Sequence, residues 1–204
     1  AALRRPSHLA NDADCFAVSE ATDGAGAGHR IVFGGILGTG VGGGLVVDGQ
    51  PLGGPNAISG EWGHNPLPWT QDSERPGPEC YCGQYGCIEA FLSGPGLIHD
   101  HETHTGQVSC APDITDSETL ARYEHRLARA LASVINIVDP DVIVLGGGLS
   151  NIGRLYQNVP VLWQSWIFSD TCVTPLKKNH HGDSSGVRGA AWLWPAASDV
   201  GADA

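Results

Sequence analysis

The 204-residue chain is 41% hydrophobic and has a formal net charge of −11, with only 11 lysines and arginines. This composition suits one sizeable domain and excludes a disordered chain. It also argues against a surface that binds nucleic acid or anionic membranes, because such surfaces need clustered cations. No apolar run is long enough to span a bilayer.

The start of the chain predicts a helix preceded by a capping side chain. We expect it from about Ala13 to Ala21, with Asn11 or Asp12 as its cap, because a side-chain oxygen at that position accepts a hydrogen bond from a free helix N–H. The Gly/Ala-rich residues 23–30 then predict a loop. From the residues alone, Asp12 needs no role beyond capping.

Residues 31–47 predict two strands around a glycine turn at Gly38, Thr39 and Gly40. Such a turn can place backbone N–H groups and the Thr39 hydroxyl against phosphates. The alternative is an ordinary tight turn between two strands.

Three cysteines fall within eight positions, at Cys80, Cys82 and Cys87, with His64 upstream. Thiolates on a glycine-turned knuckle with one imidazole predict a closed, structural Cys3His zinc site. The alternative is free or disulfide-paired cysteines, although Cys80 and Cys82 are too close to pair comfortably. Six cysteines without a secretory leader indicate a reducing compartment, so we expect a cytoplasmic protein.

The second half of the chain predicts an α/β arrangement. Residues 117–138 have apolar side chains at helical spacing, Asp116 or Ser117 as cap and Asp139-Pro140 as stop. An apolar strand over 141–145 leads into Gly146, Gly147 and Gly148, an order typical of a nucleotide site at the end of a sheet. A glycine-rich turn without ligand is the alternative.

The remaining segments give weaker predictions. We expect a polar surface loop over 70–79 and a solvated, loop-like segment around His99, His101 and His104. A helix interrupted near Pro160 should cover 151–168, a strand 172–178, and a closing helix should begin near Gly186.

The central motif resembles the signature of ROK-family sugar kinases. It reads Glu61-x-Gly63-His64, then Cys80-x-Cys82-Gly83-x-x-Gly86-Cys87-x-Glu89. Residues 11–13, 38–44 and 139–148 also resemble the family, over a span from about Leu9 to Trp194. The stretches LANDA, GEWGHNPLPW, CYCGQYGCIE and HGDSSGVRGAAWLW most resemble bacterial fructokinases that also accept mannose.

The resemblance implies an actin/hexokinase-like (ribonuclease H-like) α/β nucleotide-binding lobe that carries a small zinc knuckle. Family kinases begin with an Asp-x-Gly-Gly-Thr loop that is not found here, so we expect most of the first lobe to be missing. Residues 1–28 would then be the end of the first, small lobe and the crossover. Residues 29–204 would form the second, large lobe, with the zinc-binding insertion at 60–90.

The resemblance also implies ATP- and Mg²⁺-dependent phosphorylation of a hexose, with fructose as the expected substrate and mannose as a further one, at O6. Asp12 would be the general base. The sugar would bind to Asn11, Glu61, His64 and Glu89, with His64 serving both zinc and sugar. The nucleotide would bind to Gly38, Thr39, Gly40, Gly146, Gly147 and Gly148.

Family members commonly have Asn at the position of Asp14, so this chain has a second carboxylate beside the expected base. It either raises the pKa of Asp12 by like-charge repulsion or points into solvent. The resemblance further implies a homodimer, and little or no activity for this chain alone. The alternatives are the sugar-binding lobe of a ROK-type repressor and a non-catalytic remnant.

Overall fold

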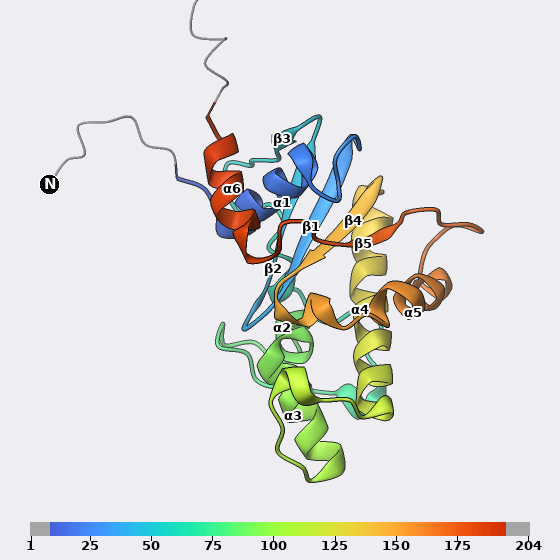
Figure 1. Cartoon of the computed structure of the whole chain (residues 1–204). Helices are drawn as coiled ribbons and strands as arrows, with labels where there is room; N and C mark the ends of the chain where they lie inside the picture. The colour runs from blue at the N-terminus through green and yellow to red at the C-terminus, as the bar shows by residue number, and fades with distance from the viewer. Residues whose placement is uncertain (1–8, 195–204) are drawn as a thin grey trace, which may run out of the picture.

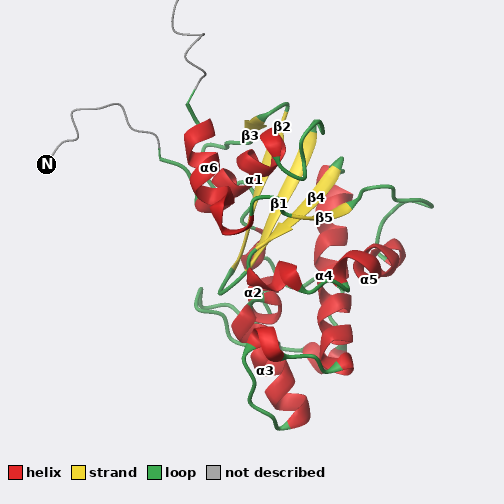
Figure 2. Ribbon diagram, in the orientation of Figure 1, coloured by secondary structure: helices red, strands yellow, loops and turns green. Residues whose placement is uncertain are grey.

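The computed structural model describes residues 9–194, and a five-stranded mixed sheet lies at its centre (Figures 1 and 2). Its strand order is β3-β2-β1-β4-β5. Strands β1 and β2 pair antiparallel, whereas β4 runs parallel to both β1 and β5. The strands are β1 (Ile31–Leu37), β2 (Val41–Val47), β3 (Gln50–Pro51), β4 (Val142–Gly146) and β5 (Leu176–Lys178).

Helices cover both faces of this sheet, as expected for an α/β nucleotide-binding lobe. On one face, α1 (Asp12–Asp23) contributes Phe16 and Val18 to a core with alternate residues of β1 and β4, such as Val32 and Val142. The opposite face packs against α4 (Ser117–Val138) and α5 (Leu155–Leu162), and Figure 1 shows α6 (Ser185–Trp192) beside α1.

Glycines in the sheet let α1 approach its surface closely. A Cβ at Gly44 would lie 2.5 Å from the carbonyl oxygen of Ala13, and one at Gly34 would lie 3.0 Å from Ala17 Cβ. The helix predicted from about Ala13 to Ala21 is confirmed as α1, with slightly wider bounds and with Asn11 as its capping residue. Its N-terminus lies against the first residues of β2.

A smaller helical part extends from one end of the sheet and contains α2 (Ile88–Leu92) and α3 (Gly94–Thr105). Ser93 ends α2 and caps α3, accepting a hydrogen bond of 3.2 Å from the N–H of Gly96. The prediction of a loop-like segment at 99–104 is wrong, because the segment lies on α3. His99 and His104 are exposed as expected, but His101 is buried against Thr119.

Three further predictions need correction or confirmation. The prediction of α4 at 117–138 is confirmed, with Asp116 as its cap. The helix predicted over 151–168 is shorter, because α5 covers Leu155–Leu162 and a 3-10 turn follows it. The strand predicted over 172–178 is limited to β5.

Within the described residues, no helix is both long and apolar enough to cross a membrane.

The loop at 70–79 is not wholly a surface loop. Glu74 is buried and binds Arg126 and Arg129 on α4, at 3.0 Å and 2.6 Å respectively. Arg129 also donates to the carbonyl of Trp69. These contacts fasten the chain between His64 and Cys80 to the long helix, so they support the knuckle that follows.

Candidate active site

Three polar side chains meet where α1 begins. Asn11 Nδ2 donates to Glu61 Oε1 at 2.9 Å, and Asn11 Oδ1 accepts from the N–H of Ala13 at 2.8 Å. Asp12 is the next residue, in the first turn of α1, and it is exposed. The fold thus brings together Asp12, Asn11 and Glu61, which the sequence analysis placed in one site.

Asp14 is half-buried, and its Oδ1 is buried without a hydrogen-bond partner among the described residues. Burial raises the pKa of Asp14, and the negative charges of Glu61 and Asp12 raise it further. The side chain therefore does not simply point into solvent. It lies in the same negative field as the two exposed carboxylates.

His64, Cys80, Cys82 and Cys87 form a second cluster, in which all four ligand atoms lie within 4.8 Å of one another. Cys80 Sγ is 3.5 Å from His64 Nδ1, and Cys82 Sγ is 3.7 Å from Cys87 Sγ. A tetrahedral zinc site with its usual bond lengths has edges of about 3.6–3.8 Å. The four residues therefore fit a zinc ion, and the cysteines are free rather than disulfide-bonded.

The chemistry of the cluster agrees with a metal site. Burial, together with the neighbouring thiols of Cys82 and Cys80, raises the pKa of Cys87 to about 12. Three adjacent thiols are costly to ionise unless a divalent cation compensates their charge. Gly83 and Gly86, at φ of 85° and 72°, let the backbone turn around the site.

Tyr81, which the sequence analysis missed, lies against His64. Its hydroxyl oxygen is 2.8 Å from His64 Nε2, and the two rings meet edge-on with centroids 5.0 Å apart. The negative charge of Glu89 raises the pKa of Tyr81, with further contributions from burial, Cys80, Cys82 and Glu61. The sequence offered no signal beyond an aromatic residue between two metal-ligand positions.

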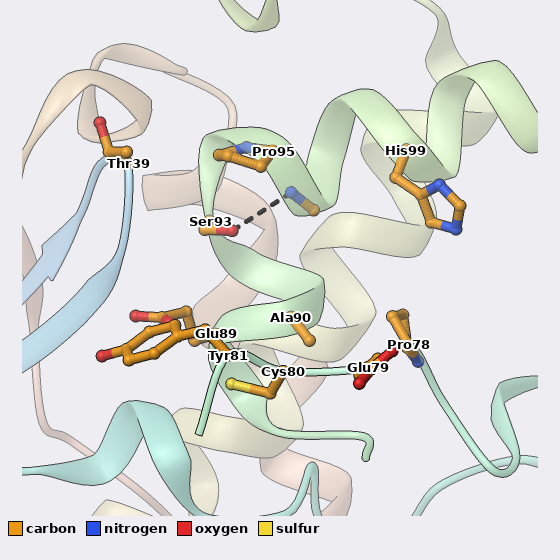
Figure 3. A pocket seen from close by; sticks show the side chains of 11 residues that line it. Thr39, Pro78, Glu79, Cys80, Tyr81, Glu89, Ala90, Ser93, Pro95 and His99 are labelled. Carbon is orange, nitrogen blue, oxygen red and sulfur yellow. Dashed lines mark hydrogen bonds between the residues drawn. The ribbon is translucent and has the colours of Figure 1, made fainter. Parts of the chain in front are cut away.

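Glu89 links the knuckle to the glycine hairpin, because its Oε2 accepts from the N–H of Val41 at 2.8 Å. A cavity of about 450 Å³ opens beside it (Figure 3). Thr39, Tyr81 and Ser93 contribute to its wall, together with Glu89. The hairpin turn, the knuckle and the start of α3 therefore share one cavity.

The first residues of β2 join the two clusters. A Cβ at Gly42 would lie 3.6 Å from Ala13 Cβ on α1, while the carbonyl of Gly42 accepts from Trp62 Nε1 at 2.7 Å. Val41, the preceding residue, holds Glu89. The start of α1, which carries Asp12, and the Glu89 carboxylate thus border the same short stretch of strand.

The two glycine stretches lie at one end of the sheet, because β1 and β4 are parallel and Ile36 pairs with Gly146. A Cβ at Gly147, where φ is 82°, would lie 2.4 Å from the carbonyl oxygen of Leu37. Within residues 9–194, the N–H groups of Thr39 and Gly40 have no hydrogen-bond acceptor. The turn therefore offers donors of the kind that bind phosphate oxygens.

Comparison with known proteins identifies the family. The model of the ROK family matches residues 1–197. The chain belongs to the ROK family. It is 39% identical to an N-acetyl-D-glucosamine kinase of Pectobacterium atrosepticum over an alignment of 204 positions, which includes 94% of this chain and 67% of that protein.

Solved ROK structures share the fold. The ROK hexokinase from Thermus thermophilus matches with a TM-score of 0.78 at 28% identity, covering 92% of this chain and 64% of that one. A ROK-family glucokinase from Streptomyces griseus, solved with glucose and AMPPNP, matches at 0.77 and 25%, covering 91% and 67%. These matches confirm the actin/hexokinase-like fold, and this chain spans about two thirds of each of those proteins.

A ROK-family transcriptional regulator, a homologue of the Escherichia coli MLC protein, also matches, with a TM-score of 0.72 and 25% identity. The match covers 90% of this chain and 50% of the regulator. This lobe therefore occurs in ROK proteins that bear kinase names and in one named as a regulator.

Proposed function

We propose that the protein containing this chain is an ATP- and Mg²⁺-dependent kinase that phosphorylates the 6-hydroxyl of a hexose. The observation that carries the proposal is the convergence of two polar clusters on the first residues of β2. Ala13, next to Asp12, lies against Gly42, and Gly63, next to His64, lies against Val41. The N–H of Val41 donates to Glu89, and Asn11 links Glu61 to the start of α1. Phosphoryl transfer depends mainly on positioning and charge stabilisation, which such a convergence supplies.

Asp12 is proposed as the general base that takes the proton of the attacking hydroxyl. It is exposed in the first turn of α1, and neighbouring Asn11 holds Glu61 in place. The carboxylates of Glu61 and Glu89 suit the task of accepting hydrogen bonds from neighbouring sugar hydroxyls. A site built on such bonds discriminates against ligands that lack the hydroxyls.

The nucleotide would bind at the shared end of β1 and β4. Thr39 and Gly40 would donate to its phosphates, from a turn in which the N–H of Gly38 donates to the Gly40 carbonyl at 2.9 Å. Gly146, Gly147 and Gly148 would lie against its adenosine. Mg²⁺ would neutralise charge on the transferred phosphate. Zinc would fix His64 in position through the knuckle, so it is proposed as a structural rather than a reacting ion.

Fructose remains the substrate proposed from the sequence, since the motifs around Glu61 and Glu89 resemble those of fructokinases. N-acetyl-D-glucosamine is the second candidate, because a relative 39% identical carries that name. We propose that residues 1–28 are the end of a small lobe and that residues 29–204 form a large lobe. We also propose that the protein functions as a homodimer. We expect the 204-residue chain alone to have little or no activity.

The rival function is that of a sugar-responsive regulator, which the shared lobe architecture permits. The presence of Asp12 beside Asn11 and Glu61 favours the kinase, because a sensor has no use for a general base. A non-catalytic remnant is the third candidate.

The proposal is tested by ADP release from the full-length protein with fructose, mannose, glucose and N-acetyl-D-glucosamine. A kinase gives sugar-dependent turnover with at least one of them, and the ratio of kcat/KM values decides between fructose and N-acetyl-D-glucosamine. Sugar binding without turnover on any of the four would favour the regulator or the remnant.

A further inference from the structure

A second cavity, of about 290 Å³, lies between the loop at residues 73–78 and helix α3. It adjoins the cavity of Figure 3, with which it shares Pro78 and His99, but the proposed kinase site does not use it. Arg126 of α4 and Phe91 form part of its wall, and the guanidinium carbon of Arg126 lies 4.9 Å from the centre of the Phe91 ring. Because Arg126 is only 7% exposed, the wall contains a buried cation.

The ionic network behind this cavity has one more positive than negative group. It consists of two carboxylates and three guanidinium groups, from Glu74, Asp100, Arg122, Arg126 and Arg129. All four carboxylate oxygens accept hydrogen bonds from these arginines, so the carboxylates are already paired. Within the described residues, the wall contains no carboxylate besides these two. The excess charge therefore favours an anion in the cavity, although the whole chain has a net charge of −11.

The Arg126 guanidinium has one nitrogen that the network does not use. Its Nε donates to Glu74 at 3.0 Å, and its Nη1 donates to Asp100 at 2.7 Å. Among residues 9–194, Nη2 has no acceptor, and it is not enclosed by protein atoms, so its N–H groups open into the cavity that Arg126 lines. Guanidinium N–H groups form their strongest hydrogen bonds with phosphate and carboxylate oxygens.

Polar side chains surround the rest of the cavity. His99, Thr103 and His104 line it from α3, and Ser73 lines it from the opposite loop, all at exposed positions. Hydroxyl and imidazole groups can donate hydrogen bonds to an oxyanion. A phosphate group has three free acceptor oxygens that point in different directions, so donors on α3, α4 and the loop suit it better than a planar carboxylate.

We propose that this cavity binds a phosphate group, as inorganic phosphate or as part of a phosphorylated sugar, with Arg126 Nη2 as the main donor. The site goes beyond the proposed kinase function, because it contains neither the Thr39–Gly40 turn nor the carboxylates proposed to bind the sugar. A bound phosphate would link α3 to the loop that leads to Cys80.

Calorimetric titration of the zinc-loaded full-length protein tests the site, with inorganic phosphate and a hexose 6-phosphate as ligands. A saturating non-hydrolysable ATP analogue occupies the nucleotide site, so phosphate bound there is not counted. The wild type should bind one phosphate. Thr103→Glu places a carboxylate in the wall without touching the buried network, and it should weaken binding about 10-fold or more, because like charges then face each other. Gln107→Glu makes the same charge change at an exposed position outside the cavity and should match the wild type.

Arg126→Lys keeps the positive charge but lacks the unused N–H groups, so it should also weaken phosphate binding. Since it disturbs the pairing of Glu74 and Asp100 as well, the decision rests on Thr103→Glu.

Three results would overturn the inference: no binding of either ligand to the wild type, unchanged binding in Thr103→Glu, or equal weakening in Thr103→Glu and Gln107→Glu. Tighter binding of the hexose 6-phosphate would support a phosphorylated sugar as the ligand, whereas equal affinities would support the phosphate group alone. None of these measurements needs turnover, so a failure of the kinase proposal would leave them valid.

Discussion

Asn11 donates a hydrogen bond of 2.9 Å from its Nδ2 to Glu61 Oε1, across a sequence separation of 50 residues. The other end of the same amide caps α1 by accepting from Ala13. One side chain therefore fixes the helix that carries Asp12 and a carboxylate proposed to bind the sugar.

Replacing Asn11 by Asp separates these two tasks. Aspartate caps a helix as well as asparagine does, so the melting temperature should stay close to that of the wild type. The new carboxylate cannot donate to Glu61 and repels it, so the KM for sugar should rise about 10-fold or more. Asn11→Ala should in addition cost about 1 kcal/mol of stability. A sugar KM unchanged in Asn11→Asp would contradict the positioning role of the amide.

The knuckle predicts one zinc ion per chain. Cys87→Ser should abolish stoichiometric zinc binding and sugar binding together, because His64 and Glu89 would lose their support. Cys110→Ser is the control, since Cys110 is exposed and lies outside the cluster. Elemental analysis of the purified protein measures the metal. A zinc-free wild type with full sugar affinity would show that the cluster does not need the ion.

The Glu74–Arg129 ion pair should stabilise the loop that connects His64 to Cys80. Arg129→Met leaves the buried Glu74 with one fewer partner, and the loss of one member of a buried pair typically costs about 3–5 kcal/mol. Arg75→Met is the control, because Arg75 pairs with Asp72 at the surface, and it should change the free energy of unfolding by less than about 0.5 kcal/mol. Equal effects in urea titrations would contradict this account.

The same pair predicts a pH dependence of stability. Burial opposes ionisation of Glu74, but hydrogen bonds from Arg129, the N–H of Gln71 and Arg126 lower its pKa from 4.5 to about 2. A lowered native pKa means that the contribution is complete above pH 4.5 and is lost as the pH falls towards 2. In Glu74→Gln, the slope of unfolding free energy over this window should be smaller than in the wild type.

Glu20 forms a comparable junction between α1 and the segment that leads into α6. Burial opposes its ionisation, but hydrogen bonds from the N–H groups of His180, Ala25 and His181 and from the Ser185 hydroxyl hold its pKa below the usual value. Glu20→Gln should increase hydrogen exchange in α6 and lower stability by about 1–3 kcal/mol. Glu102→Gln, at an exposed position of α3, should do neither.

Local sequence patterns predicted the elements that local interactions decide. The α4 helix has apolar residues at helical spacing, a cap at Asp116 and a stop at Asp139, so its bounds were predicted correctly. The segment around His101 was mispredicted because its histidines are loosely spaced among acidic residues and look loop-like, whereas Ser93 caps a helix there. A serine cap with proline in the first turn is a start signal that could have identified it.

Long-range contacts were beyond the sequence patterns. The burial of Glu74 depends on Arg126 and Arg129, which lie 52 and 55 residues further along the chain. The zinc ligands were predicted because three of them are close in sequence and their chemistry is distinctive. Tyr81 was not, since its contact with His64 depends on the turn of the knuckle rather than on any spacing.

The central claim is that Asp12 takes the proton of the attacking sugar hydroxyl, and Asp12→Asn in the full-length protein tests it most directly. Single-turnover kinetics with the sugar that the wild type phosphorylates should show a rate lower by about 10²- to 10⁴-fold, with sugar affinity retained. Asp14→Asn, two residues away, should keep most of the activity. A phosphoryl-transfer rate in Asp12→Asn close to that of the wild type would contradict the account.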